Sequence, residues 1–198
     1  MKNILLFLAL LTGLSCGAFA QESRQDVSFS AMGIFPPTAI GNGVHQTPSY
    51  TLGGLASYRY MLTPRSAIEG NFGYWQNTQH FVSPSNDIRV YARNLEFSGA
   101  YVFNFNYRKL NPFVEAGPAA IMSRPILNSG TQTFDTKSST NVGVLFGGGI
   151  AYEISPSFDI RIQYRGIVSK APSYNLSNFS TGKYGVTNLP TIGVGYHF

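Results

Sequence analysis

Cysteine, histidine and charged residues are scarce in this chain. Its 198 residues include one cysteine and three histidines, and only 12% of them are Asp, Glu, Lys or Arg. One cysteine cannot build a disulfide framework or a cysteine metal site. The three histidines, His45, His80 and His197, are too dispersed to suggest a metal cluster. We therefore expect no metal ion and no cofactor.

Helical periodicity and long apolar runs are also lacking. Beyond residue 20, no stretch is apolar enough for a membrane helix. Tyrosine (12), phenylalanine (15) and glycine (21) are abundant instead, which favours many short strands and turns. If the chain enters a membrane it must do so as a barrel, because only helices and closed barrels satisfy all their backbone polar groups there.

Residues 1–20 read as a secretory signal peptide. Lys2 supplies a positive charge, residues 4–11 are an uninterrupted apolar run, and Ala18-Phe19-Ala20 is a small-x-small cleavage site. The apolar run is too short to span a bilayer as a helix. We expect residues 21–198 to form one domain.

The alternative for this segment is a lipoprotein signal, in which Cys16 becomes the lipidated first residue. Gly13 disfavours it, because such signals usually carry a Leu-like residue at that position. Cleavage after Ala20 instead leaves a mature domain without cysteine and, having lost Lys2, with a net charge one unit below the +5 of the whole chain.

Segments with two-residue alternation recur along the chain, each close to the length of about 9–11 residues that a tilted membrane strand needs. The connections between them alternate between short turns and long polar loops, and outer-membrane barrels place the short turns in the periplasm. The pattern predicts an all-β fold, an eight-stranded antiparallel up-and-down transmembrane β-barrel with both termini periplasmic. The predicted strands are 26–35, 49–61, 66–76, 90–103, 112–122, 142–154, 159–168 and 186–198, and the predicted long loops are 36–48, 77–89, 123–141 and 169–185.

One face of most of these strands is apolar, with residues such as Phe72, Phe146 and Ile162, and the other is polar or small. A soluble barrel of the lipocalin type would turn its apolar face inward around a ligand. Aromatic residues cluster at the ends of the apolar face, however, as they do at membrane interfaces. The two expected girdles are Tyr58, Tyr60, Tyr101, Phe103, Tyr152, Tyr196 and Phe198 at one end, and Phe35, Tyr50, Tyr74 and Tyr91 at the other.

Two prolines fit this reading badly. Pro118 and Pro190 fall within predicted strands, where a closed sheet has no edge to tolerate a missing N–H. Each predicts a bulge or a misplaced strand boundary.

Charged residues of both signs share the polar face, which would line the lumen. An eight-stranded barrel is only just wide enough for its side chains to fill, and an unpaired buried charge is costly. We expect a structural ion-pair network that closes the lumen, in preference to a gated ion path or a catalytic acid–base pair. Its members are Arg59, Glu69, Glu96, Glu115, Arg161 and Arg165.

Two further motifs carry little weight. His80, Ser83 and Asp87 are the residue types of a hydrolytic triad, but closeness within a loop is weak evidence, because a triad is recognised by geometry. Gly147-Gly148-Gly149 lies inside a predicted strand and is therefore no phosphate-binding loop. In a barrel, such glycines relieve crowding.

The expected outer loops and their rims carry an excess of positive charge. Six basic residues stand against Asp87 and Asp135, and they favour contact with anionic groups such as the phosphates of lipopolysaccharide. Nucleic acid is not an expected partner, because no aromatic and basic groove is visible. The basic residues are Arg89, Arg93, Arg124, Lys137, Lys170 and Lys183.

The last eight residues resemble the C-terminal signal of bacterial outer-membrane β-barrels, which runs polar, any, Gly, any, any, aromatic, any, aromatic. The four specified positions are filled by Thr191, Gly193, Tyr196 and Phe198. Together with the signal peptide and the strand pattern, they make the chain similar to the small OmpA/OmpX-type barrels. The segment Gln163-Tyr164-Arg165-Gly166-Ile167 leading to Lys170-Ala171-Pro172 looks like part of an uncharacterised group of such barrels. The resemblance implies a Gram-negative outer membrane, contact with its lipid, and assembly by the barrel-assembly machinery.

The leading hypothesis for function is a non-enzymatic barrel with a structural or surface-interaction role through its four basic loops. A lipid A-modifying barrel enzyme and a narrow ion channel are the alternatives. The lipid A deacylases it would resemble have a His-x-Ser-Asn pattern late in the chain, whereas the comparable stretch here, Gln163-Tyr164-Arg165-Gly166, has no histidine.

Overall fold

The computed structural model describes residues 24–84, 86–105, 109–126, 137–174 and 180–198, so the predicted signal peptide lies outside the described residues. In these ranges no helix has the length and apolar character needed to cross a membrane. The strands are β1 (Gln25–Ile34), β2 (Ala39–Gly41), β3 (Val44–Pro48), β4 (Thr51–Thr63), β5 (Ser66–Ser83), β6 (Asn86–Asn104), β7 (Leu110–Pro125), β8 (Ser139–Ser155), β9 (Phe158–Lys170) and β10 (Tyr184–His197).

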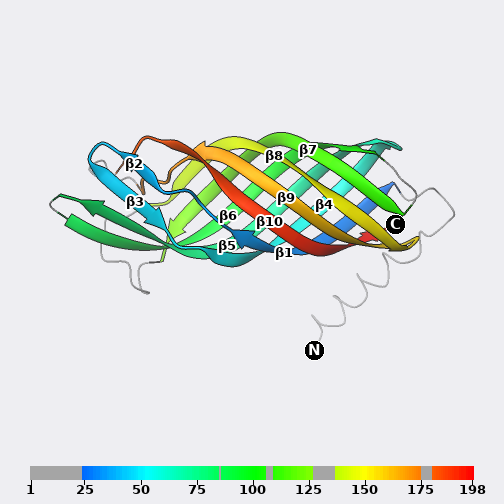
Figure 1. Ribbon diagram of the computed structural model, residues 1–198, viewed down its shortest axis with the longest axis horizontal. Helices are drawn as coiled ribbons and strands as arrows, with labels where there is room; N and C mark the ends of the chain where they lie inside the picture. The colour runs from blue at the N-terminus through cyan, green and yellow to red at the C-terminus, as the bar shows by residue number, and fades with distance from the viewer. Residues whose placement is uncertain (1–23, 85, 106–108, 127–136, 175–179) are drawn as a thin grey trace, which may run out of the picture.

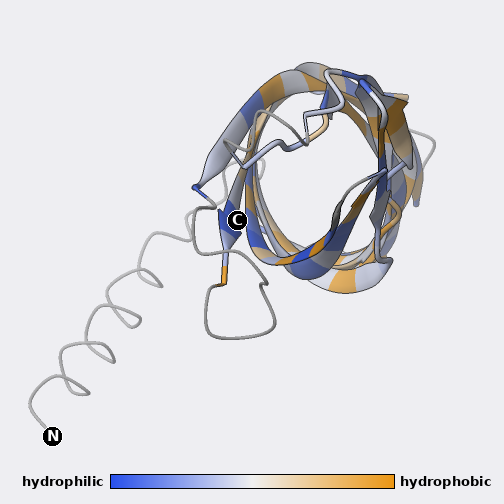
Figure 2. Cartoon of the chain, turned by 90° about the vertical axis from the view of Figure 1, so that its left-hand side faces the viewer, coloured by the Kyte–Doolittle hydropathy of each residue, from blue (hydrophilic) through white to orange (hydrophobic). Residues whose placement is uncertain are grey.

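Eight of these strands form a closed antiparallel barrel, which confirms the predicted fold class. Around the barrel, β1 pairs with β4, and β4 to β10 then follow in chain order. The β5–β6 and β10–β1 pairings complete the ring, which is visible in the view along the barrel (Figure 2). The extra strands β2 and β3 form a hairpin added to β5 through β3.

The barrel has two different ends (Figure 1). The β4–β5 and β8–β9 turns lie at one end, which we call the short-turn end. There Phe198 donates a backbone hydrogen bond to Gln25, so the end of the chain lies beside the start of β1. The opposite end, the long-loop end, carries the β2–β3 and β5–β6 hairpins.

Two predicted loops contain regular structure at the long-loop end. Residues 77–89 continue β5 and β6 in an unbroken ladder as far as Ser83 and Asn86. Residues 36–48 hold the β2–β3 hairpin, which turns at Asn42 and Gly43 with the positive φ angles that such two-residue turns require. The loop prediction was wrong there because the period-2 pattern continues with mostly polar residues, among which a few apolar side chains such as Val44 and Phe81 pack inside.

The assignment of the two strand faces is confirmed. Apolar side chains such as Phe146 (41% exposed) and Ile162 (59%) point outward, whereas Glu69 and Glu96 are buried in the lumen. The aromatic residues predicted for the girdles are mostly exposed at the two ends of the outer wall, among them Tyr101 and Tyr50. This arrangement suits a wall that faces lipid.

No register shift accompanies either proline, so the predicted bulges are absent. The β7–β8 ladder runs through Pro118, and the β9–β10 ladder runs through Pro190, each without a break. The pairing is interrupted only on the other side of each proline. The β1–β10 ladder, for example, stops at Met32 and Thr191 and resumes in the same register at Phe35 and Asn188. At each proline the missing N–H is thus tolerated because the ladder with one of the two neighbouring strands has a local gap there.

Candidate functional site

The six charged residues predicted for the lumen are all buried there. They form groups of ion pairs, and the first group surrounds Arg59 near the short-turn end. Arg59 and Glu69 are cross-strand partners on β4 and β5. Arg59 Nη2 and Nε lie 2.6 Å and 2.7 Å from Glu69 Oε2. The guanidinium group also lies 4.7 Å from the centre of the Phe113 ring, a cation–π distance.

A second group surrounds Arg161, and Asp26 connects it to the first. Asp26 lies 3.2 Å from Arg161 and 4.0 Å from Arg59. Arg161 also binds Asp159 at 2.9 Å, and His197 contacts the same carboxylate at 2.9 Å. Sequence reasoning missed Asp26 and Asp159, although Asp159 precedes Arg161 by two residues and must share its strand face.

Arg165 holds a third group across the middle of the lumen. It binds Glu96 at 2.8 Å and donates a hydrogen bond of 3.1 Å to Ser98 Oγ, both on β6. Arg165 Nε also lies 3.4 Å from Glu115 Oε1 on β7, but neither Glu115 oxygen has a hydrogen-bond partner. Arg165 therefore ties β9 to two strands on another part of the wall, and Glu115 is its weaker partner.

Three lumen carboxylates lie opposite a glycine on the next strand. The cross-strand pairs are Gly73 with Glu96, Gly147 with Glu115, and Gly195 with Asp159. A Cβ atom at Gly147 would lie 2.7 Å from Glu115 Oε1, and one at Gly195 would lie 2.5 Å from Asp159 Oδ1. These glycines make the room that the carboxylates occupy.

An apolar layer follows the charges toward the long-loop end, and here the expectation of a uniformly polar or small lumen face was wrong. Its side chains are almost fully buried, and beyond them polar contacts resume, with Ser123 Oγ donating to Asn94 and Asn94 Nδ2 donating to Asn77. The same apolar cluster extends among the charges through Phe113, whose ring lies against Arg59. The larger side chains of the layer are Met32, Ile34, Leu55, Trp75, Leu145, Ile167 and Leu189.

A vestibule of about 330 Å³ opens at the short-turn end. It is lined by Asp26, Arg59, Asp159, Arg161 and His197, so the ion pairs form its floor. The lumen is therefore filled in successive layers of ion pairs, apolar side chains and amides.

The predicted triad types do not assemble on one face. His80 and Asp87 bind each other on the outer side of the β5–β6 hairpin. Ser83 lies an odd number of positions from His80 along β5, so its side chain points to the opposite face. His45 instead contacts Thr47 at 3.2 Å, and His197 lies at the other end of the barrel. In the part of the chain that the structure describes, no three His, Cys, Asp or Glu side chains gather as metal ligands would.

Two arginines lie side by side on the outer wall near the long-loop end. Arg93 on β6 and Arg124 on β7 are exposed cross-strand partners, next to the exposed ring of Tyr91. Among the described residues, neither makes an ion pair. Lys170 and Lys183 lie on the β9–β10 side of the same end, and Asp135 lies outside the described residues.

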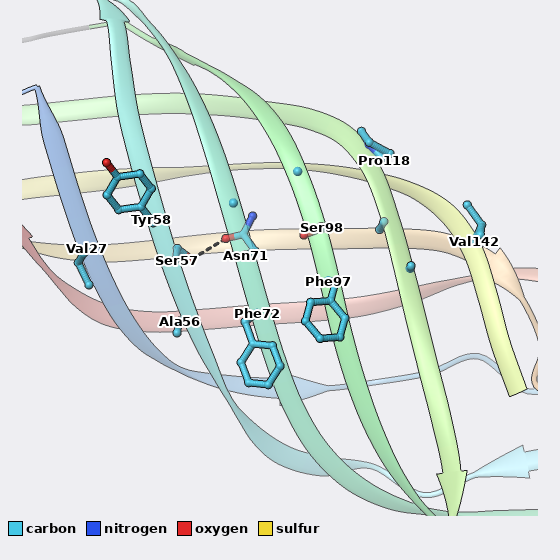
Figure 3. A pocket seen from close by; sticks show the side chains of 14 residues that line it. Val27, Ala56, Ser57, Tyr58, Asn71, Phe72, Phe97, Ser98, Pro118 and Val142 are labelled. Carbon is cyan, nitrogen blue, oxygen red and sulfur yellow. Dashed lines mark hydrogen bonds between the residues drawn. The ribbon is translucent and has the colours of Figure 1, made fainter. Parts of the chain in front are cut away.

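The outer wall of β4 to β7 carries a hollow of about 690 Å³. Small residues such as Gly70, Gly99 and Ala120 are part of its lining. Phe72 and Phe97, which also line it, lie side by side with ring centres 5.2 Å apart (Figure 3). Its apolar lining matches the lipid-facing position of the wall.

A family model for the outer membrane protein beta-barrel domain matches residues 6–198. The chain belongs to this family. It is therefore a transmembrane β-barrel of the outer membrane of Gram-negative bacteria. Curated proteins yield no match to the chain.

Solved barrels show the same fold at low sequence identity. OprG from Pseudomonas aeruginosa has a TM-score of 0.62 and 10% identity, over 90% of this chain and 97% of OprG. Neisserial surface protein A has a TM-score of 0.58 and 17% identity, over 89% and 98%. Ail, the attachment invasion locus protein of Yersinia pestis, solved with the heparin analogue sucrose octasulfate, has a TM-score of 0.50 and 17% identity, over 88% and 99%.

Proposed function

We propose that this barrel is a non-enzymatic surface-interaction protein, whose lumen is a structural plug and whose long-loop end binds anionic partners. Lipopolysaccharide is the first of these partners. The observation that carries the proposal is the layered lumen, in which Arg59, Arg161 and Arg165 form ion pairs with carboxylates of the same barrel. A lumen filled in this way supports neither an open ion path nor a catalytic acid–base pair, so the outer surface remains for function.

The proposed orientation places the long-loop end outside the cell and both chain ends in the periplasm. It rests on the general rule that outer-membrane barrels have short periplasmic turns and longer extracellular loops. In this orientation Tyr91 belongs to the outer aromatic belt, and the neighbouring Arg93 and Arg124 reach the level of the lipid headgroups.

The Arg93–Arg124 pair supports lipopolysaccharide as a partner. Two guanidinium groups on adjacent strands would repel each other unless an anion lies between them, and guanidinium groups bind phosphate with two hydrogen bonds. The similar barrel Ail was solved with a polyanionic heparin analogue. That complex is a property of Ail, so the proposal for this chain rests on its own arginines.

The terminal strand supports a proposed second partner, the barrel-assembly machinery. Tyr196 and Phe198 stack on the outer wall with ring centres 6.0 Å apart, whereas Thr191 and Gly193 lie on the lumen face of β10. In this reading the two exposed rings are what the machinery recognises.

The test of lipopolysaccharide binding compares two double variants of the purified barrel in detergent. Arg93→Gln with Arg124→Gln removes the proposed site, and Arg24→Gln with Arg65→Gln removes the same charge at the short-turn end. Because a basic residue near an anionic surface contributes about 1 kcal/mol, the first pair should weaken lipopolysaccharide binding by roughly 30-fold. The effect should shrink as salt is added.

Equal losses in the two double variants would contradict the proposed site, because they would reflect net charge alone. Planar-bilayer recordings test the plug separately. The parent barrel should be electrically silent, and a steady large conductance would favour the channel alternative.

A further inference from the structure

A cavity of about 260 Å³ lies at the long-loop end, where the barrel wall is interrupted. In the described chain, strand β2 pairs with β3 alone. Its other edge lies beside the residues that precede β10, where Asn42 Nδ2 donates a hydrogen bond to the Ser180 carbonyl oxygen, but no ladder forms. The segment containing Pro36 and Pro37 crosses this seam, and the cavity opens between it and the ends of β9 and β10. The site is separate from the lumen network and from Arg93 and Arg124.

The cavity contains one buried polar group whose hydrogen-bonding capacity is unused. Gln46 is only 2% exposed. Its Nε2 donates to Gln79 Oε1 at 3.0 Å and lies 3.4 Å from the carbonyl oxygen of Pro172, whereas its Oε1 has no partner. Reversing the amide would set its oxygen against the Pro172 carbonyl oxygen, which can only accept, so the free atom is an acceptor. A buried acceptor without a partner is costly, and a ligand that donates a hydroxyl hydrogen would satisfy it.

Positive charge lies at the cavity rim, and no carboxylate is among the described residues that line the cavity. Lys170 and Lys183 line the cavity and are exposed. Neither makes an ion pair among the described residues, and the sequence has no Asp or Glu in residues 27–68, 70–86 or 160–198, which supply the whole lining. The ligand should therefore be an anion.

The remaining lining mixes apolar and polar side chains. Pro36, Pro37, Pro48 and Pro172 supply saturated apolar rings, and the exposed ring of Tyr184 lies at the rim. The polar members are Thr38, Gln79, Ser169 and Thr187. The volume is just below the range of about 300–1,000 Å³ typical of sites for drug-sized ligands. It suits one six-membered ring with small polar substituents.

We propose that this cavity binds a single acidic sugar residue, with a ring hydroxyl donated to Gln46 Oε1 and its carboxylate held by Lys170 and Lys183. The sugar ring packs against the prolines. This inference deepens the proposed surface function, because it names the chemical class of one anionic partner, but it depends on different residues. The sugar can come from the core of lipopolysaccharide or from a separate acidic polysaccharide.

The test is a titration of the full-length mature barrel in detergent micelles, followed by calorimetry and by the side-chain amide resonances of Gln46. The probes are methyl β-glucuronide, the neutral methyl β-glucoside and inorganic phosphate. The glucuronide should bind and shift the Gln46 resonances, the glucoside should bind at least about fivefold more weakly, since it lacks the charge, and phosphate should leave the resonances unmoved.

Three variants locate the site. Gln46→Met, which keeps the side-chain length, should weaken glucuronide binding by about three- to tenfold. Lys170→Gln and Lys183→Gln should each weaken it by roughly two- to fivefold. Lys137→Gln is the matched control, because Lys137 is exposed at the same end but does not line the cavity.

Several outcomes would overturn the proposal. These are equal binding of glucuronide and glucoside, equal effects of Lys183→Gln and Lys137→Gln, or phosphate binding that moves the Gln46 resonances as the sugar does. The resonances of the parent protein keep the test valid if Gln46→Met fails to fold. Competition by lipopolysaccharide core oligosaccharide or by oligogalacturonate then identifies the source of the sugar. The Arg93 and Arg124 variants should leave glucuronide binding unchanged, so failure of the lipopolysaccharide proposal is distinguishable from failure of this one.

Discussion

Replacing Arg165 is the sharpest perturbation of the lumen. Arg165 is fully buried and contacts the carboxylates of Glu96 and Glu115, which are themselves buried. Arg165→Met keeps much of the side-chain volume but leaves two negative charges without their partner. Breaking a buried ion pair in this way typically costs about 3–5 kcal/mol, and the two carboxylates place the expected value in the upper part of that range.

Glu115→Gln gives a contrasting expectation at the same site. Glu115 lies 3.4 Å from Arg165 and makes no hydrogen bond, whereas Glu96 retains its 2.8 Å contact with Arg165. Arg165 therefore stays paired in this variant, and its cost should be below about 1 kcal/mol. The triple variant with Arg165→Met, Glu96→Gln and Glu115→Gln should recover much of the loss from Arg165→Met alone, because no unpaired charge is left.

Urea titration of the barrel in lipid vesicles measures these differences as changes in the free energy of unfolding. The heat-dependent shift of the folded band in gels gives an independent check on folding. If Arg165→Met proved within about 0.5 kcal/mol of the parent, or if Glu115→Gln cost as much as Arg165→Met, the assignment of Arg165 as the centre of the group would fail. Electrical leakage of Arg165→Met through planar bilayers, with a silent parent, would add support for the plug.

Three other changes test the wall, the packing and the assembly of the barrel. Phe146→Arg, placed mid-strand on the outer face, should cost about 2–4 kcal/mol in refolding titrations into vesicles, and a variant as stable as the parent would invert the assignment of the two faces. Gly147→Ala should cost roughly 1–3 kcal/mol in the same assay, because its Cβ would lie 2.7 Å from Glu115 Oε1 and 2.6 Å from the Tyr164 carbonyl oxygen. An unchanged midpoint would show that both Glu115 and the β9 backbone at Tyr164 move freely. Deletion of Phe198 should reduce the amount of protease-resistant barrel in outer membranes, and equal amounts would remove the proposed role of the terminal signal.

Sequence periodicity predicted the barrel and its two faces because side chains alternate strictly along a strand. The same rule placed Arg59, Glu69 and Arg165 in the lumen. It did not show which charges meet, because Arg165 reaches Glu96 across 69 positions of sequence. Asp26 was missed because it lies at the start of β1, where a single charge at a strand end is not part of a two-residue alternation.

The apolar layer was missed for a different physical reason. Leu55 and Ile167 are apolar residues on the lumen face, and next to outward-facing apolar residues they blur the two-residue alternation. The extended hairpin at the long-loop end was missed because a strand with mostly polar residues, broken only by a few apolar ones such as Phe81, has the composition of a loop. Neither feature changes the closure of the barrel, which depends on hydrogen bonding between backbones.

Packing of the lumen also helps to hold the walls of the cavity at the long-loop end in place. Arg165 fixes β9 against β6 and β7, and β3 is held to β5 by its ladder. The two walls of the cavity beside Gln46 are therefore both attached to the rigid ring, although the wall between them is interrupted. A ligand that enters this cavity meets a Gln46 side chain already in position, so only the exposed side chains of Lys170 and Lys183 must be ordered on binding. It follows that the cavity requires no movement of the lumen charges, and that Arg165→Met should weaken sugar binding only as far as it unfolds the barrel.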